Sequence, residues 1–97
     1  MKIAVVGATG LVGRKIINLC EKYFASDVNY SFFASSKSAG SELEINGNKI
    51  TVQELNDDNI SNFDISLFSA GGEKSKLFAK KFLDEGSFVI DNSSAFR

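Results

Sequence analysis

The feature that most constrains this 97-residue sequence is a glycine-rich segment, Gly7 to Gly13, between two apolar patterns of different period. The run before it, Ile3 to Val6, is uniformly apolar and ends at glycine, as expected of a parallel strand buried on both faces. The segment after it, Gly10 to Phe24, has the period of an amphipathic helix. The predicted apolar face of this helix consists of Val12, Ile16, Leu19, Cys20 and Tyr23.

The rest of the chain continues this alternation of strands and helices. Further strands are predicted at Val28 to Ala34, Ile65 to Phe68 and Phe88 to Ile90. A second helical face, before Gly86, consists of Phe78, Ala79, Phe82 and Leu83. The strand–helix–strand order implies parallel strands joined by crossover helices, and such crossovers are right-handed in nearly all cases.

One insertion interrupts this order. The segments Leu43–Ile45 and Ile50–Val52 alternate around Asn46-Gly47, which is a strong hairpin signal. The predicted fold class is therefore α/β, a doubly wound (Rossmann-type), mostly parallel sheet with a hairpin inserted after its second strand.

The glycine segment predicts a site for the pyrophosphate of a dinucleotide. Gly7 allows the sharp turn, Gly10 lets the backbone approach the ligand without a Cβ, and Gly13 lets the helix pack closely on the strand. The helix N-terminus adds N–H groups and a partial positive charge. A tight strand-to-helix turn without a ligand is the alternative, and a Walker loop is excluded because no Gly-Lys-Ser/Thr follows.

The end of the second predicted strand discriminates between NAD and NADP. An acidic residue there would accept hydrogen bonds from a ribose 2′-hydroxyl, whereas this chain has Ser35, Ser36, Lys37 and Ser38. Hydroxyl groups around one cation suit a 2′-phosphate, so NADP is the predicted cofactor. The alternative is a solvated surface loop.

Two further strand ends are predicted to lie on the same edge of the sheet. Ser69, Ala70 and Gly71 are small enough for close approach of a cofactor, although Ser69 could equally cap a helix. Asn92 follows the last strand and is expected on the nicotinamide or substrate side. Arg97 could hold an anionic substrate by a bidentate contact, or could simply be solvated.

Composition excludes several other classes of protein. The net charge is −1 without a basic stripe, and no apolar run approaches the ~18 residues of a membrane span, so neither nucleic acid nor membrane is an expected partner. The only cysteine, Cys20, is on the predicted apolar helix face, and no histidine exists to activate it. We expect an inert buried thiol, no metal site and a cytoplasmic protein.

Four segments together resemble the N-terminal part of the aspartate-semialdehyde dehydrogenase family. They are Val6–Gly13, Ala34–Gly40, Phe68–Gly72 and Val89–Arg97. The resemblance runs along the whole chain, and the last segment is the most specific. The acylglutamyl-phosphate reductases have a similar domain, but they tend to have an acidic residue within the stretch that matches Asn92 to Ala95 here.

The resemblance implies NADPH-dependent, reversible conversion of L-aspartyl 4-phosphate to L-aspartate 4-semialdehyde with release of phosphate, in lysine, threonine and methionine biosynthesis. It implies a homodimer or homotetramer. It also implies that Thr9, Gly10, Leu11 and Val12 cradle the pyrophosphate, that Lys37 and Ser38 bind the 2′-phosphate, and that Arg97 binds the substrate phosphate. This chain departs from the family at Lys37, where members commonly have arginine; lysine keeps the positive charge on which NADP preference depends but loses the fork geometry of the guanidinium group.

The family's catalytic cysteine and histidine belong to a second domain, and Cys20 does not match the nucleophile's motif. Residues 1–97 are therefore expected to form an incomplete protein, the N-terminal NADP-binding domain without the catalytic and dimerisation domain, and to be inactive alone. A stand-alone NADP-sensing module is the competing hypothesis. It would have no use for a substrate-binding Arg97.

Overall fold

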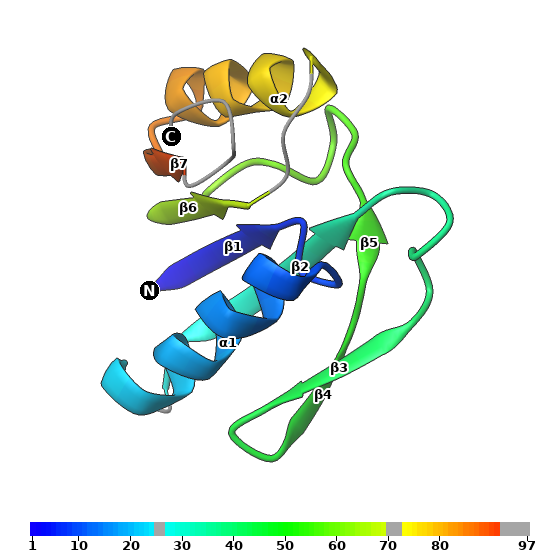
Figure 1. Ribbon diagram of the computed structural model, residues 1–97. Helices are drawn as coiled ribbons and strands as arrows, with labels where there is room; N and C mark the ends of the chain where they lie inside the picture. Colours follow the sequence, from blue (N-terminus) through cyan, green and yellow to red (C-terminus); the bar gives the residue numbers. More distant parts are fainter. Residues whose placement is uncertain (25–26, 70–72, 92–97) are drawn as a thin grey trace.

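The computed structural model describes residues 1–24, 27–69 and 73–91, with residues 73–75 described by their backbone alone. The strands are β1 (Lys2–Val6), β2 (Asn29–Ala34), β3 (Glu42–Ile45), β4 (Asn48–Thr51), β5 (Gln53–Glu54), β6 (Ile65–Phe68) and β7 (Phe88–Asp91), and the helices are α1 (Leu11–Tyr23) and α2 (Glu73–Asp84). Five strands form one sheet in the order β5-β2-β1-β6-β7, and each neighbouring pair is parallel (Figure 1). The predicted doubly wound sheet is confirmed.

The sheet is buried on both faces at its centre, because Ile3 to Val6 of β1 are all apolar and all buried. On β1, Ile3 and Val5 belong to a core shared with α1, whereas Ala4 and Val6 belong to a core shared with α2. The α2 side is rich in aromatic rings, with Phe82 in edge contacts at 5.6–6.3 Å between ring centroids. Continuous burial of this kind is typical of parallel sheets covered by crossover helices.

The predicted apolar face of α1 is partly wrong. Its buried residues are Gly13, Ile17 and Cys20, whereas Leu19 is 54% exposed and Tyr23 is 71% exposed. The reason is the close contact of Gly13 with the turn before the helix, which fixes the rotation of α1 about its axis. Positions four and seven residues after Gly13 then face the sheet.

On α2 the prediction holds for Phe78 and Phe82, which are buried, but not for Leu83, which is 57% exposed. Helix α2 packs on β6 and on β7, which is the edge strand of the sheet among the described residues. Within this part of the chain, one side of the apolar surface of α2 has no strand to contact.

The predicted hairpin is confirmed as the antiparallel pair β3–β4. Both residues of its two-residue turn have positive φ, 51° at Asn46 and 81° at Gly47, as a type I′ turn requires. Ile45 and Val52 anchor the hairpin region in the α1-side core. The short edge strand β5 was not predicted, because two polar residues give no apolar signal.

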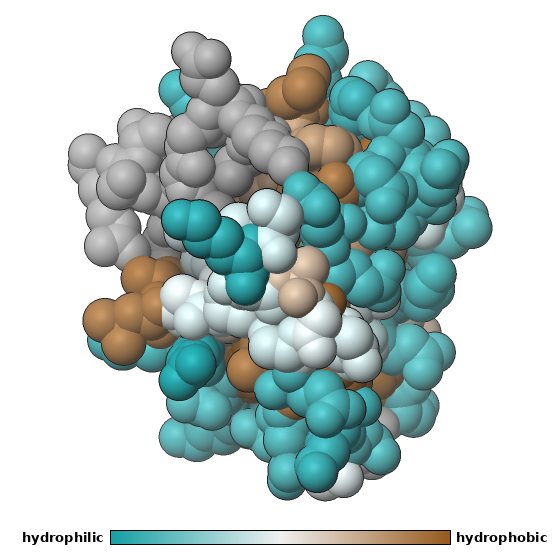
Figure 2. Space-filling model, turned by 90° about the vertical axis from the view of Figure 1, so that its right-hand side faces the viewer, coloured by the Kyte–Doolittle hydropathy of each residue, from teal (hydrophilic) through white to brown (hydrophobic). Residues whose placement is uncertain are grey.

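The carboxyl ends of the sheet strands all point to one side of the molecule, which faces the viewer in Figure 2. The centre of this face is pale and its surroundings are mostly teal, with hydrophobic residues only in separate patches (Figure 2). Ligands of open α/β sheets bind at such an edge.

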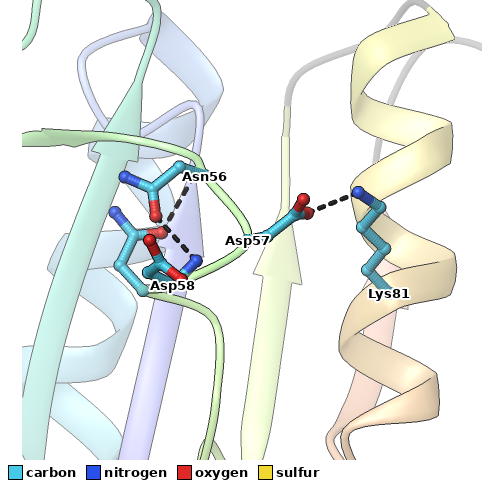
Figure 3. Close-up of polar contacts among 5 residues, drawn as sticks. Asn56, Asp57, Asp58 and Lys81 are labelled. Atoms are coloured by element: carbon cyan, nitrogen blue, oxygen red, sulfur yellow. Dashed lines mark hydrogen bonds and ion pairs between the residues drawn. The ribbon is translucent and has the colours of Figure 1, made fainter.

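The connection from β5 to β6 is fixed by polar contacts and by the buried side chains of Leu55, Ile60 and Phe63. Asn59 donates a hydrogen bond to the carbonyl of Glu54 (2.8 Å). Asp57 forms an ion pair with Lys81 of α2, and the amide of Asp58 donates to the side chain of Asn56 (Figure 3). These contacts hold the connection against α2 where the chain returns to β6.

Candidate dinucleotide-binding site

The turn between β1 and α1 is anchored to the neighbouring strand β2. The backbone N–H groups of Gly7 and Ala8 both donate to the carbonyl oxygen of Phe33, at 2.8 and 3.1 Å. Gly7 has φ 84°, a conformation that favours glycine. The amides of Gly7 and Ala8 are therefore used within the fold, and the role of Gly7 is the turn itself.

Gly13 is required by the packing of α1. A Cβ at this position would lie 2.0 Å from the carbonyl oxygen of Gly7 and 2.9 Å from the Cα of Ala8. Both neighbours are backbone atoms that cannot rotate away. The geometry is that expected of the third glycine of a dinucleotide-binding turn.

Gly10, in contrast, is not required by the fold. Its φ and ψ are −76° and 170°, which any residue can adopt. Among the described residues, a Cβ there would contact only the carbonyl oxygen of Gly7, at 3.4 Å. Gly10 is exposed and precedes α1 without a side-chain cap. The lack of a side chain at Gly10 leaves space beside the turn, which a ligand would need in order to approach the backbone closely.

The start of α1 offers amides to an anion. The amide of Gly10 donates to Gly7 (3.1 Å), but those of Thr9, Leu11 and Val12 have no acceptor within the described part of the chain. The first turn of the helix contains no acidic residue. Unpaired N–H groups and the positive end of the helix dipole together favour a phosphate group.

The segment after β2 forms a compact turn close to the hairpin. The amides of Ser38 and Ala39 both donate to the carbonyl of Ser35 at 3.0 Å, and the hydroxyl of Ser41 donates to the carbonyl of Ser38 (2.6 Å). Ser35, Ser36 and Lys37 are exposed and Ser38 is half-buried. Lys37 forms no ion pair within the ranges that the structure describes, so its ammonium group is available to an anion.

Ser69 brings the end of β6 to the same place. Its amide donates to the carbonyl of Val6 (2.9 Å), and its hydroxyl lies 3.0 Å from that oxygen and 3.1 Å from the carbonyl oxygen of Gly7. The third predicted strand end is therefore joined directly to the glycine turn. Four predicted site residues, Ala70, Gly71, Asn92 and Arg97, lie outside the described residues.

Cys20 is the buried thiol that the sequence predicts. It is 2% exposed, in the core between α1 and β2. Burial raises the pKa of the Cys20 thiol, and the neighbouring Tyr30 hydroxyl only partly opposes this effect. A thiol whose ionised form is disfavoured is a poor nucleophile.

Other kinds of site are not found in the described residues. No group of three His, Cys, Asp or Glu side chains is placed to hold a metal ion within them. No helix of the described chain is long and apolar enough to cross a membrane. A surface hollow of about 260 Å³ lies instead between β2 and the hairpin, lined by Val28, Asn29, Tyr30, Ile45, Asn46, Asn48 and Ile50.

Sequence reasoning did not anticipate this hollow or the Phe33 carbonyl that anchors the turn. The hollow arises from how the hairpin folds back beside β2, which no local pattern specifies. The Phe33 contact is made by backbone atoms, so its residue type gives no indication of it.

A parallel sheet, a glycine turn with unpaired amides at its carboxyl edge and a helix starting there define a Rossmann-type dinucleotide-binding domain. The family model described as "Semialdehyde dehydrogenase, NAD binding domain" matches residues 2–97. The chain belongs to this family.

Similar proteins agree with this assignment. The chain is 44% identical to the aspartate-semialdehyde dehydrogenase of Corynebacterium glutamicum, with 98% of this chain and 28% of the relative covered. It is 44% identical to that of Aquifex aeolicus, with 99% and 28% covered. A crystal structure of aspartate semialdehyde dehydrogenase II from Vibrio cholerae, complexed with ASA, superposes with a TM-score of 0.88 at 35% identity, covering 98% of this chain and 31% of that one. The chain thus spans under a third of the length of these relatives.

Proposed function

We propose that this domain binds NADP as the N-terminal part of an aspartate-semialdehyde dehydrogenase. The observation that supports this most directly is Gly10. Among the described residues, a Cβ there would meet no clash and the neighbouring amides of Thr9, Leu11 and Val12 have no acceptor, yet the position is glycine. A pyrophosphate against these amides explains both features.

The choice of NADP over NAD rests on the turn after β2. Lys37 is exposed and unpaired among the described residues, and Ser35, Ser36 and Ser38 surround it in the sequence. Ammonium and hydroxyl groups suit a phosphate dianion, and the turn contains no carboxylate that would repel it. Ser38 and Lys37 would bind the 2′-phosphate, with the pyrophosphate at the start of α1.

The remaining site residues belong to the same proposal. Ser69, Ala70 and Gly71 would line the cofactor beside the glycine turn, Asn92 would lie on its nicotinamide side, and Arg97 would bind the substrate phosphate. Bound NADPH would supply the hydride, while this domain holds and orients it. The substrate would be L-aspartyl 4-phosphate, reduced to L-aspartate 4-semialdehyde with release of phosphate in lysine, threonine and methionine biosynthesis.

We further propose that residues 1–97 are one domain of a longer cytoplasmic enzyme, a homodimer or homotetramer, whose catalytic and dimerisation domain is separate. The relatives are more than three times as long as the matched segment. Phe88 and Ile90 of β7 support the same idea, since they are 66% and 46% exposed on a sheet of a class that is covered on both faces. The additional domain would supply a catalytic cysteine and histidine.

Calorimetric titration of the protein with NADPH and with NADH tests the proposed function. We expect binding of both, with NADPH bound at least tenfold more tightly, because a charge-assisted hydrogen bond contributes about 1.5–3 kcal/mol. Failure to bind either dinucleotide would exclude a cofactor-binding function. Equal affinities would restrict the proposal to a domain without NADP preference.

A further inference from the structure

Besides the Phe33 contacts of its amides, the glycine turn is held through the carbonyl group of Gly7. Its oxygen accepts a hydrogen bond from the amide of Gly10 (3.1 Å) and lies against the Cα side of Gly13. Glycine at positive φ leaves the orientation of the following peptide group weakly determined. A contact that fixes this oxygen therefore also fixes the direction of the peptide groups that follow it.

Ser69 makes such a contact from a distant part of the chain. Its hydroxyl lies 3.1 Å from the Gly7 oxygen and 3.0 Å from the Val6 oxygen, so that its single proton is shared between two backbone acceptors. Its amide donates to the same Val6 oxygen. The hydroxyl proton is thus engaged with the protein backbone, and the side chain is half-buried.

We propose that Ser69 is a positioning residue for the dinucleotide, acting through the glycine turn. By holding the Gly7 carbonyl inward, its hydroxyl keeps the unpaired amides of Thr9, Leu11 and Val12 directed towards the pyrophosphate. This inference rests on the proposed function and assigns to Ser69 a role distinct from direct contact with the cofactor. Because the pyrophosphate is common to NAD and NADP, the role is independent of the 2′-phosphate.

Two variants of Ser69 and one matched control test the proposal. Ser69→Ala removes the hydroxyl, whereas Ser69→Thr retains it. Ser66→Ala is the control, since Ser66 is a fully buried serine of β6, the strand that ends just before Ser69, and its hydroxyl is hydrogen-bonded to that of Ser87 (2.6 Å). All three variants and the wild type are titrated with NADPH, NADH and 2′-AMP, which lacks a pyrophosphate.

We expect Ser69→Ala to lower the affinities for NADPH and NADH to the same extent. The loss should be roughly two- to tenfold, the range that one neutral hydrogen bond contributes. Its affinity for 2′-AMP should be unchanged, and Ser69→Thr should restore dinucleotide binding. Ser66→Ala should melt at a lower temperature but bind like the wild type. Unchanged dinucleotide affinity in Ser69→Ala, or an equal loss for 2′-AMP, would overturn the positioning role.

Backbone amide order parameters of the ligand-free protein give a second readout that needs no cofactor. Ser69→Ala should lower the order parameters of Thr9 and Gly10, and Ser69→Thr and Ser66→Ala should leave them at wild-type values. Unchanged order parameters in Ser69→Ala would contradict the inference. A wild type that binds no dinucleotide would instead refute the proposed function, while these relaxation data would still decide the role of Ser69.

Discussion

The three glycines between Gly7 and Gly13 differ in what the fold requires of them. Gly7 is needed for its backbone conformation, with φ 84°, and Gly13 for the packing of α1, where a Cβ would meet a carbonyl oxygen at 2.0 Å. Neither requirement applies to Gly10, because any residue can adopt its conformation and a Cβ would meet no clash with the described residues. Substitutions of Gly7 and Gly13 should consequently lower stability, whereas a substitution of Gly10 should mainly affect binding.

Gly10→Val tests this separation. The new side chain would occupy the space proposed for the pyrophosphate, so NADPH binding should fall below detection in a calorimetric titration. Stability should fall by about 1 kcal/mol or less, the usual difference between residue types at a helix N-cap. Gly13→Ala is the opposite control and should lose about 1–3 kcal/mol of stability through overpacking. Undiminished NADPH affinity in Gly10→Val would refute the pyrophosphate assignment.

Lys37→Glu tests cofactor selectivity. It replaces an exposed cation in the turn after β2 by a charge that repels a 2′-phosphate, so NADPH affinity should fall tenfold or more, given about 1.5–3 kcal/mol for a charge-assisted hydrogen bond. NADH affinity should change little. Lys49→Glu, the same charge reversal on the exposed hairpin strand β4, controls for net charge. Equal losses for both dinucleotides in Lys37→Glu would show that Lys37 does not contact the 2′-phosphate.

Between secondary-structure elements, Cys20 of α1 and Tyr30 of β2 pack in the same core cluster. The Tyr30 hydroxyl is buried and forms no hydrogen bond of good geometry with the described residues. Burial raises the pKa of Tyr30 from 10.0 to about 12, with smaller contributions from Cys20 and Glu21. Between these pH values the folded protein retains a proton that the unfolded chain releases, so stability falls as the pH rises through this window.

Tyr30→Phe should remove this part of the pH dependence. Denaturant titrations between pH 7 and pH 12 should show a shallower loss of stability above pH 10 for the variant than for the wild type. At pH 7 the variant should be at least as stable, since it removes a buried hydroxyl without a well-formed partner. Lower stability of the variant at pH 7 would show that the hydroxyl is well hydrogen-bonded, and an equally steep loss above pH 10 would show that Tyr30 does not cause the pH dependence.

Sequence patterns predicted the elements well where a local rule decides them. Asn46-Gly47 specified the hairpin, and the apolar run at Ile3 to Val6 specified the central strand. Patterns failed where tertiary contacts decide. Leu19 has the period of a core residue, but the contact of Gly13 with the turn rotates it into solvent.

The candidate site was predictable to a similar extent. The glycine turn and the serine–lysine turn follow from residue types placed after strands, because parallel strands bring their carboxyl ends to one edge. The anchoring of the turn by the Phe33 carbonyl was not predictable, since backbone contacts have no residue signature. The role of the Ser69 hydroxyl depends on which strand lies beside β1, which only the sheet order β2-β1-β6 reveals.

For the whole molecule, residues 1–97 belong to a dinucleotide-binding family, and the proposed reduction of an acyl phosphate would also need a reactive thiol and a general base. The chain contains no histidine, and its one thiol, Cys20, is 2% exposed. We therefore expect no NADPH- or phosphate-dependent semialdehyde turnover by a polypeptide of residues 1–97, with or without Cys20→Ser. Activity should appear when a domain with the catalytic cysteine and histidine is supplied in the same chain or in trans. Turnover by residues 1–97 that disappears in Cys20→Ser would refute both the domain assignment and the inertness of Cys20.

The central claim is that a dinucleotide binds at the carboxyl edge of the sheet, and an NMR titration of the ¹⁵N-labelled protein with NADPH tests it most directly. The largest shifts should occur at the amides of Thr9, Leu11 and Val12 and in the turn formed by residues 35–38. The hollow beside the hairpin, represented by Asn29 and Asn46, should show no change. Shifts concentrated at Asn29 and Asn46, or no shifts at saturating NADPH, would contradict the claim.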